Sequence, residues 1–250
     1  MIEMNEKLIQ SLLPGKILSV QVGLTRTAVL AETNDGIRCG LAATLTNRDE
    51  HEGRPAVQNA GRLQTMNYID LASLIESYSL VETSIGLATI NALLPRHPNE
   101  WVDLNAEDYL AEHGAHKNVA IVGHFPFVDR LRSLTQNLWV LELNPRDGDL
   151  PAQAAPEVVP QSDVLAITAT TLINKTFQGL IDLCRPDTTV ILVGPSAPLS
   201  PVMYDYGIDV LFGTIVTDPQ SALLGVGQGI SLRQLQQEKL VRLVTLTKGK

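Results

Sequence analysis

The sequence has few aromatic residues and no long apolar run. Aromatic residues make up 4% of the 250 residues, so the core must be built from valine, isoleucine, leucine and alanine. No apolar run approaches the roughly 18–20 residues that a membrane span needs. The opening stretch MIEMNEKLIQ contains acidic residues and lacks the apolar region of a secretory signal. We therefore expect a cytoplasmic protein that does not bind membranes.

Charge and cysteine content exclude further classes. The formal net charge of −8 argues against nucleic-acid binding, which depends on lysine and arginine neutralising phosphates. Cys39 and Cys184 are far apart and form no C-x-x-C motif, so neither a structural zinc site nor a disulfide framework is indicated. No H-E-x-x-H, P-loop or G-x-S-x-G motif occurs. No metal ligands are predicted, the cofactor stays unknown, and any metal is expected to arrive with its own ligand.

The first hundred residues have the pattern of strands followed by helices. Apolar, β-branched stretches predict strands at 16–24, 26–33 and 37–45, with a hairpin turn at 34–36. A long polar loop at 46–61 follows, of a length often associated with function. Helical spacing predicts helices at 67–77 and 81–95, the second opened by a capping box of Ser79 and Glu82. Residues 1–98 are expected to form an α+β domain, a β-meander plus helices.

From Asn118 the pattern changes. Continuous apolar runs alternate with helical or polar segments, as in a parallel sheet that helices cover on both faces. The runs are NVAIVGHF, LWVLELN, DVLAITAT, TTVILVGP and GIDVLFGTIV, with a last strand expected at 238–247 and an irregular crossover at 147–162. We expect an α/β chain in which a linker with a short helix, 99–117, leads to a Rossmann-like, doubly wound domain at 118–250.

Ligands of an open parallel sheet bind beyond the carboxyl ends of its strands. The first strand ends in VGHFP, where His124 and Phe125 stand in place of the glycines of a dinucleotide loop, so a diphosphate is not expected to approach. Gly123 permits a tight turn, and Pro126 suits the first position of a helix. His124 is either a proton carrier or a residue that packs over the sheet edge.

Later strand ends add polar residues. Glu142 lies 19 residues after Gly123, roughly where dinucleotide-binding domains keep the acid that holds ribose; the alternative is a salt-bridged carboxylate. Thr170 or Thr171 can cap a helix with Asn174 in its first turn, which makes either an anion site or a simple cap. The proline-stiffened loop Gly194–Ser196 suits a pocket wall or a stiff turn.

Several motifs, in order, resemble the heavy-metal chelation domain family. VGHFPF, LELNP, DVLAITATTLINKTF, VILVGPSAPLSP and GIDVLFGTIVTDP resemble its C-terminal domain, and TAVLAETNDGIRCGLAATL and SLVETSIGLATINALLP its N-terminal domain. The resemblance implies an enolase N-terminal-like domain, then a Rossmann-like domain similar to methyltransferases, with the site between them. It implies condensation or hydrolysis of pterin-, flavin- or siderophore-like compounds connected to metal handling.

The strand ends and the resemblance together nominate a set of site residues. Glu142 and His124 are the candidates for proton transfer, although His124 fills a variable position of its motif. Thr44, Ser84 and Asn91 are expected to face the cleft from the N-terminal side. The expected ligand-binding residues are Gly123, Phe125, Pro126, Asn144, Thr168, Thr170, Asn174, Gly194, Pro195 and Ser196.

Three functions stay open. The first is an enzyme or binding protein that takes a small molecule in an interdomain cleft. The second is a non-catalytic module for a metal chelate. The third is a methyltransferase-like enzyme with a nucleoside ligand, which Gly123 and Glu142 favour and Pro126 disfavours. Glu142, Asn174 and the Gly194–Ser196 loop are expected to converge on one pocket, and a homodimer is compatible with the sequence.

Overall fold

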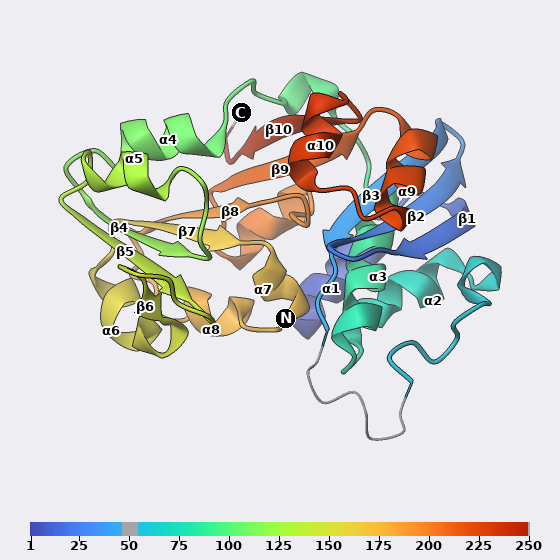
Figure 1. The fold of residues 1–250 in the computed structure, drawn as a ribbon, viewed down its shortest axis with the longest axis horizontal. Helices are drawn as coiled ribbons and strands as arrows, with labels where there is room; N and C mark the ends of the chain where they lie inside the picture. The colour runs from blue at the N-terminus through green and yellow to red at the C-terminus, as the bar shows by residue number, and fades with distance from the viewer. Residues whose placement is uncertain (47–54, 250) are drawn as a thin grey trace.

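The structure, a computed structural model, describes residues 1–46 and 55–249. It contains two sheets, which lie side by side (Figure 1). The small sheet has three antiparallel strands, and the large sheet has seven strands that are mostly parallel. The chain is thus a mixed α/β protein, as expected. Within the described residues, no helix combines the length and apolarity that crossing a bilayer requires.

The small sheet follows the predicted strands within two residues at most ends. Its strands are β1 (Gly15–Val22), β2 (Arg26–Thr33) and β3 (Gly36–Ala43). The sequence reasoning did not predict the helix α1 (Ile2–Gln10) that precedes them. The helices that follow are α2 (Tyr68–Ala72), extended by a 3-10 turn at Ser73–Glu76, and α3 (Leu80–Leu93). Residues 47–54 of the long polar loop lie outside the described part.

Helix α3 is buried on nearly every side, because the small sheet, helix α2 with its 3-10 turn, and helix α7 of the large-sheet segment all pack against it. A helix that is apolar on all sides is typical of such a buried position. Strand β3 approaches the helix closely at Gly40, where a Cβ atom would lie 2.1 Å from the carbonyl oxygen of Ala88.

The capping box predicted for α3 is half formed. The Ser79 hydroxyl accepts the Glu82 N–H at 3.4 Å, as expected. The Glu82 carboxylate does not accept the Ser79 N–H, as a full capping box requires. It accepts the Ser77 hydroxyl at 2.5 Å and the Gln58 N–H at 2.9 Å. It thereby ties the preceding loop to the helix start instead of closing the box.

The large sheet has the strand order β10-β9-β8-β7-β4-β5-β6, and only its edge strand β10 pairs antiparallel among the described strands. Its strands are β4 (Asn118–Val122), β5 (Asn137–Glu142), β6 (Leu150–Pro151), β7 (Val164–Thr168), β8 (Thr189–Val193), β9 (Val210–Val216) and β10 (Val241–Thr247). The helices around it are α4 (Ala106–His113), α5 (Val128–Arg132), α6 (Ala155–Val158), α7 (Thr170–Ile173), α8 (Phe177–Ile181), α9 (Pro219–Gly227) and α10 (Leu232–Gln237). The crossover expected to be irregular contains β6, α6 and two 3-10 turns.

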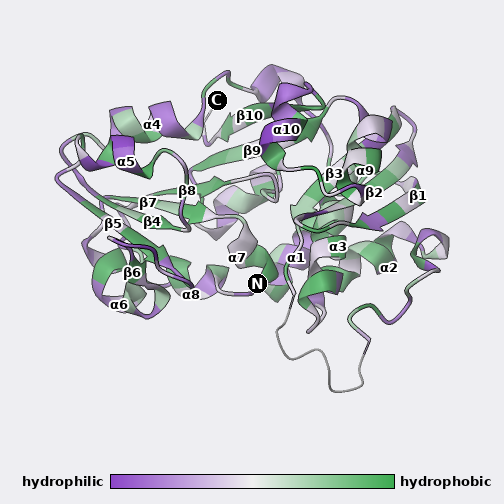
Figure 2. Cartoon of the chain, viewed as in Figure 1, coloured by the Kyte–Doolittle hydropathy of each residue, from purple (hydrophilic) through white to green (hydrophobic). Residues whose placement is uncertain are grey.

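Successive residues of a strand point to opposite faces, and the large sheet is apolar on both. Val119 and Ile121 of β4 pack beneath α4 and α5. Ala120, on the other face, belongs to a core that continues into the small sheet. Figure 2 accordingly shows hydrophobic colour along the central strands and hydrophilic colour on α4, α5 and α10.

The C-terminal segment covers the outer face of the small sheet. Leu30 and Leu41 of that sheet pack with Val226 of α9 and Leu235 of α10 in one apolar cluster. The small sheet is therefore held from both faces, and it lies beside the carboxyl ends of the large sheet's strands.

Candidate functional site

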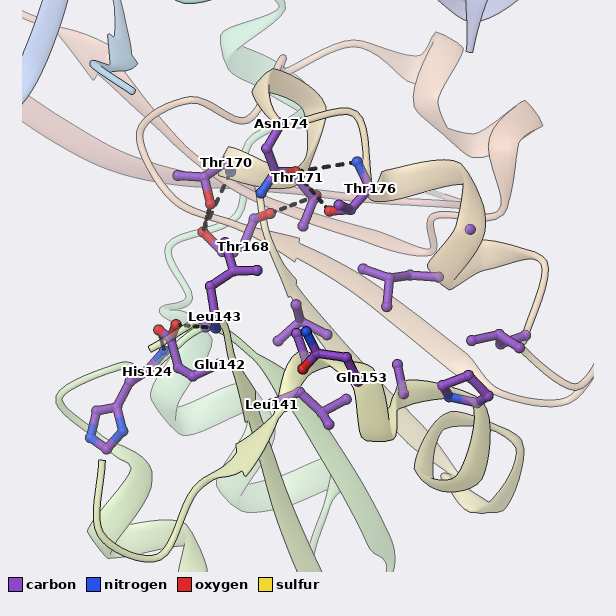
Figure 3. A pocket seen from close by; sticks show the side chains of 18 of the residues that line it. His124, Leu141, Glu142, Leu143, Gln153, Thr168, Thr170, Thr171, Asn174 and Thr176 are labelled. Atoms are coloured by element: carbon purple, nitrogen blue, oxygen red, sulfur yellow. Dashed lines mark hydrogen bonds between the residues drawn. The ribbon is translucent and has the colours of Figure 1, made fainter. Parts of the chain in front are cut away.

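A pocket of about 620 Å³ lies at the carboxyl ends of β4, β5 and β7 (Figure 3). We call it the strand-end pocket. The chain runs from β4 to β5 and β6 on one side and then crosses to β7 on the other, and such a crossing point is where open parallel sheets bind ligands. Its floor is aliphatic and its rim is polar. The lining includes Leu141, Leu180, Leu183, Glu142, Thr168, Thr170, Thr171, Asn174 and Thr176.

Threonine hydroxyls and one amide form the rim after β7. The hydroxyls of Thr168 and Thr170 lie 3.1 Å apart, and the Thr171 hydroxyl donates to the Thr168 carbonyl at 2.7 Å. The Asn174 side-chain oxygen accepts both the N–H of Thr176, at 3.2 Å, and its hydroxyl, at 2.7 Å. These bonds fix the direction of the Asn174 amide at the pocket rim.

The capped helix expected here differs from the observed one in its length, its cap and the place of Asn174. Helix α7 has only four residues, no side chain caps it, and Asn174 follows its last residue instead of lying in its first turn. The short helix has little dipole, so the pocket rim is a set of hydroxyl and amide groups and not an anion site of the helix-terminus kind.

Glu142 connects two strand ends. One carboxylate oxygen accepts the His124 N–H at 2.8 Å and the other accepts the Leu143 N–H at 2.9 Å. In the described part of the chain no lysine, arginine or histidine pairs with this carboxylate, so the salt-bridged interpretation is not met. Its negative charge faces the pocket with backbone N–H groups as its partners.

The imidazole of His124 is oriented by a carboxylate that the sequence reasoning missed. Its Nδ1 atom lies 2.9 Å from Asp149, whose side chain is 0% exposed. Burial opposes ionisation of Asp149, but hydrogen bonds from His124 and from the Arg146 N–H outweigh it and hold the pKa of Asp149 below its usual value. Figure 3 shows the ring beyond Glu142, turned away from the threonines. The turn DGDL, which contains Asp149, was the sequence feature from which this carboxylate could have been predicted.

The turn after β4 differs from the expected one. Gly123 adopts a φ of 100°, and a Cβ atom there would lie 3.0 Å from a methyl carbon of Thr168. Pro126 lies in a turn that the Val128 N–H closes onto the Phe125 carbonyl at 3.2 Å. Helix α5 begins only at Val128, so the expectation that Pro126 opens the helix is wrong; proline suits the second position of such a turn equally well.

A second pocket, of about 570 Å³, lies between the two sheets. We call it the junction pocket. The Gly194–Ser196 loop lines it together with Arg26 and Ala43 of the small sheet, and Pro126 is also part of its wall. The single pocket expected for Glu142, Asn174 and this loop is therefore two adjoining pockets. Residues common to both are Phe125, Thr168 and Thr170.

Ser196 and Asn91 join the two sheets. The buried Ser196 hydroxyl accepts the Ala43 N–H at 2.8 Å. The Asn91 amide donates to the carbonyls of Leu41, at 2.9 Å, and Ser196, at 3.2 Å. Ser196 of this loop thus serves the contact between the two sheets.

Other expected cleft residues lie elsewhere. The Thr44 hydroxyl bonds that of Thr27 at 2.9 Å, and the Ser84 hydroxyl donates to the Leu80 carbonyl of its own helix. As far as residues 1–46 and 55–249 go, Thr44, Ser84 and Asn91 line neither the strand-end nor the junction pocket. Asn144 is exposed beyond the end of β5 and also lines neither, because the chain turns away after Glu142.

The fold and the two pockets define a two-sheet α/β protein with ligand-sized space at the strand ends. Residues 105–245 match the model of the DUF364 family, described as "Putative heavy-metal chelation", and residues 5–94 match that of DUF4213, which has the same description. The chain belongs to this heavy-metal chelation family, as the motifs indicated.

Relatives are similar over most of their length. An uncharacterised protein of Methanocaldococcus jannaschii is 28% identical over 216 residues, 84% of this chain and 82% of that protein. A crystal structure of a DUF364-family protein of unknown function from Desulfitobacterium hafniense matches with a TM-score of 0.82 and 27% identity over 99% of both chains. One from Pyrococcus horikoshii matches with a TM-score of 0.85 over 98% of both chains; at 19% identity it supports the fold alone.

The family description raises the question of direct metal binding. Soft heavy metals prefer thiolate and imidazole ligands. The lining of the strand-end pocket offers hydroxyls, amides, one carboxylate and a single imidazole, that of His124, whose Nδ1 atom is held by Asp149. Burial raises the pKa of Cys39 to about 12 and that of Cys184 to about 11, so both stay protonated near neutral pH. No group of three or more metal-binding side chains occurs among the described residues. The donor set does not fit a directly coordinated heavy metal.

Proposed function

We propose that the protein binds an organic small molecule in the strand-end pocket, and that heavy metal reaches it as a complex with that molecule. The observation that carries the proposal is the wall of this pocket, an aliphatic floor under a rim of hydrogen-bonding groups held in fixed directions. Such walls suit an organic ligand with a polar edge. Glu142 and Asn174 lie on that rim and would recognise donors and acceptors of the ligand.

A finer description of the fold accompanies this proposal. The strand order equals that of doubly wound dinucleotide-binding sheets with one antiparallel strand added, which supports a Rossmann-like domain at 118–250. The antiparallel strands and helices of residues 1–98 support an enolase N-terminal-like domain, with 99–117 as linker. The separate family matches at 5–94 and 105–245 are in line with this division.

Catalysis is the second part of the proposal, and the pair of His124 and Asp149 favours it. The carboxylate of Asp149 holds the Nδ1 atom of His124. The Nε2 atom of the ring is then free to accept or deliver a proton. This would serve the condensation or hydrolysis of pterin-, flavin- or siderophore-like compounds. The ring points away from the threonine rim, so a substrate would have to extend past Glu142 to reach it.

The test uses a glycine that offers open space. Gly179 of α8 lines the strand-end pocket, and a Cβ atom there would meet nothing within 4 Å. Gly179→Phe should fill the pocket while the protein stays folded, and Gly179→Ala is the matched control that leaves room. After incubation with a cell extract, native mass spectrometry should find a retained small molecule on the wild type and on Gly179→Ala but not on Gly179→Phe.

The same experiment separates the alternatives. Equal retention by Gly179→Phe, or no retention by any form, contradicts the proposal. A retained nucleoside would favour the methyltransferase-like alternative, in which Glu142 holds ribose. If the retained molecule is a metal chelate, and neither the wild type nor His124→Gln alters it chemically, the protein is a binding module without catalysis. Elemental analysis of the dialysed protein is expected to give far less than one zinc per chain.

A further inference from the structure

The junction pocket has a composition unlike that of the chain as a whole. The sequence contains four phenylalanines, and three of them, Phe125, Phe127 and Phe212, line this pocket. The rings of Phe125 and Phe127 are stacked, with centroids 5.2 Å apart and planes 6° from parallel. In a protein that is 4% aromatic, this concentration gives one pocket flat apolar walls, which suit a planar ring.

The same pocket contains an arginine that no acidic side chain of the described residues neutralises. Arg26 is the first residue of β2 and lines the pocket. Its Nε atom is buried and has no hydrogen-bond partner among the described residues. One terminal nitrogen donates to the Thr25 carbonyl at 2.7 Å. Among residues 1–46 and 55–249, no aspartate or glutamate pairs with Arg26. Burial lowers the pKa of this guanidinium, which nevertheless stays charged because arginine is a very weak acid.

The acid in the pocket wall does not neutralise this charge. Glu107 lines the junction pocket, but its carboxylate pairs with Arg130 at 2.9 Å. A half-buried cation that lacks a partner is unfavourable in the empty protein and becomes favourable when an anion enters. Its planar fork of N–H groups matches a carboxylate with two parallel hydrogen bonds.

We propose that the junction pocket binds a planar aromatic ligand that carries a carboxylate, with the carboxylate on Arg26 and the ring against Phe125 and Phe127. This is a second site beside the strand-end pocket, and it does not depend on the function proposed for that pocket. The sequence offered one signal for it, an arginine at the start of the strand 26–33, just ahead of its apolar stretch Ala28–Ala31.

The test compares a charged and a neutral probe of the same shape. We expect 2-naphthoate to bind the full-length wild type at least about tenfold more tightly than 2-naphthamide, because the amide lacks the charge. In Arg26→Gln the affinity for 2-naphthoate should fall by about tenfold or more, and that for 2-naphthamide should change little. Arg26→Lys should be intermediate. Isothermal titration calorimetry measures all of these.

Controls keep the result interpretable. Arg62→Gln removes an exposed arginine that lines neither pocket and should bind both probes as the wild type does. Urea unfolding of each variant checks that it is folded. Arg26→Gln should be no less stable, because it removes a half-buried charge that has no ion-pair partner among the described residues. Equal affinity of the two probes, unchanged binding by Arg26→Gln, or no binding of 2-naphthoate by the wild type overturns the proposal. Loss of binding in Gly179→Phe would also overturn it, by moving the probe to the strand-end pocket.

Discussion

The two ends of strand β4 are built alike but carry different charge. At the amino end, the carboxylate of Asp163 accepts the N–H of Asn118, the first residue of the strand, at 2.9 Å. At the carboxyl end, the carboxylate of Glu142 accepts the His124 N–H at 2.8 Å. Each carboxylate thus joins β4 to a neighbouring strand. They differ in that Arg185 also binds Asp163, at 3.0 Å.

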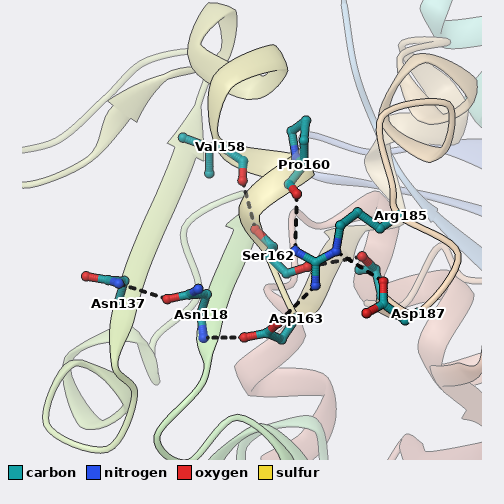
Figure 4. Close-up of polar contacts among 9 residues, drawn as sticks. Asn118, Asn137, Val158, Pro160, Ser162, Asp163, Arg185 and Asp187 are labelled. Carbon is teal, nitrogen blue, oxygen red and sulfur yellow. Dashed lines mark hydrogen bonds and ion pairs between the residues drawn. The ribbon is translucent and has the colours of Figure 1, made fainter.

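The amino end is closed by its own residues, as Figure 4 shows. Arg185 donates to Asp163, to Asp187 at 3.1 Å and to the Pro160 carbonyl at 3.2 Å. At the carboxyl edge, by contrast, the described residues give Glu142 no cation and Arg26 no anion. The amino edge thus pairs its charges within the sheet, whereas the charges of Glu142 and Arg26 are the ones that we propose for ligand binding.

The largest stability effect should come from breaking the amino end. Asp163→Ala removes the acceptor of the Asn118 N–H and one of the two carboxylates that bind Arg185. Because the Asp163 side chain is partly exposed, we expect a loss of about 1–2 kcal/mol in the free energy of unfolding, measured in urea. Ligand retention in the strand-end pocket should not change. A loss of retention equal to that of Gly179→Phe would mean that the two edges are not independent.

The stabilising effect of Asp163 should depend on pH. The Asn118 N–H, with Arg185, holds the pKa of Asp163 below its usual value. A carboxyl group whose pKa is lower in the folded state contributes stability above its unfolded pKa, near 3.9, and loses it as the pH falls through the folded pKa. Between pH 6 and pH 3, the unfolding midpoint of the wild type should therefore fall further than that of Asp163→Ala. Parallel curves would contradict this role.

Substitution of Glu142 is expected to lower the stability less than Asp163→Ala does, and to weaken ligand retention. Glu142→Gln keeps one acceptor for a backbone N–H and removes the charge, so the unfolding free energy should fall by about 1 kcal/mol or less. Retention of the small molecule should fall clearly, because the charged rim group is lost. Asn144→Ala, two residues on and exposed, is the matched control and should change neither property. If both variants retain the molecule as the wild type does, Glu142 is structural only.

Much of this arrangement could be predicted, because it rests on local patterns. Apolar runs gave the strands, and the rule that ligands bind at strand ends led to Glu142, Thr168 and Asn174, which do line one pocket. The division into two pockets could not be predicted. It depends on Ser196 meeting the small sheet 153 residues away in the sequence, a contact without a local pattern.

The same limit explains the other omissions. The pairing of His124 with Asp149 joins two turns, and the covering of the small sheet by α9 joins the two ends of the chain. The error at Asn174 has a local cause, since a helix of four residues ends where a longer one would still be in its first turns. Residues chosen only for being polar at a motif have other places in the structure: Thr44 bonds Thr27 of the small sheet, and Asn144 faces solvent.

The most direct test is a crystal structure of the protein loaded with the molecule that it retains from a cell extract. We predict density at the carboxyl edge of the large sheet, within hydrogen-bond distance of Glu142 or Asn174. Density at the amino edge around Asp163, or a molecule that touches neither of those two residues, would contradict the account.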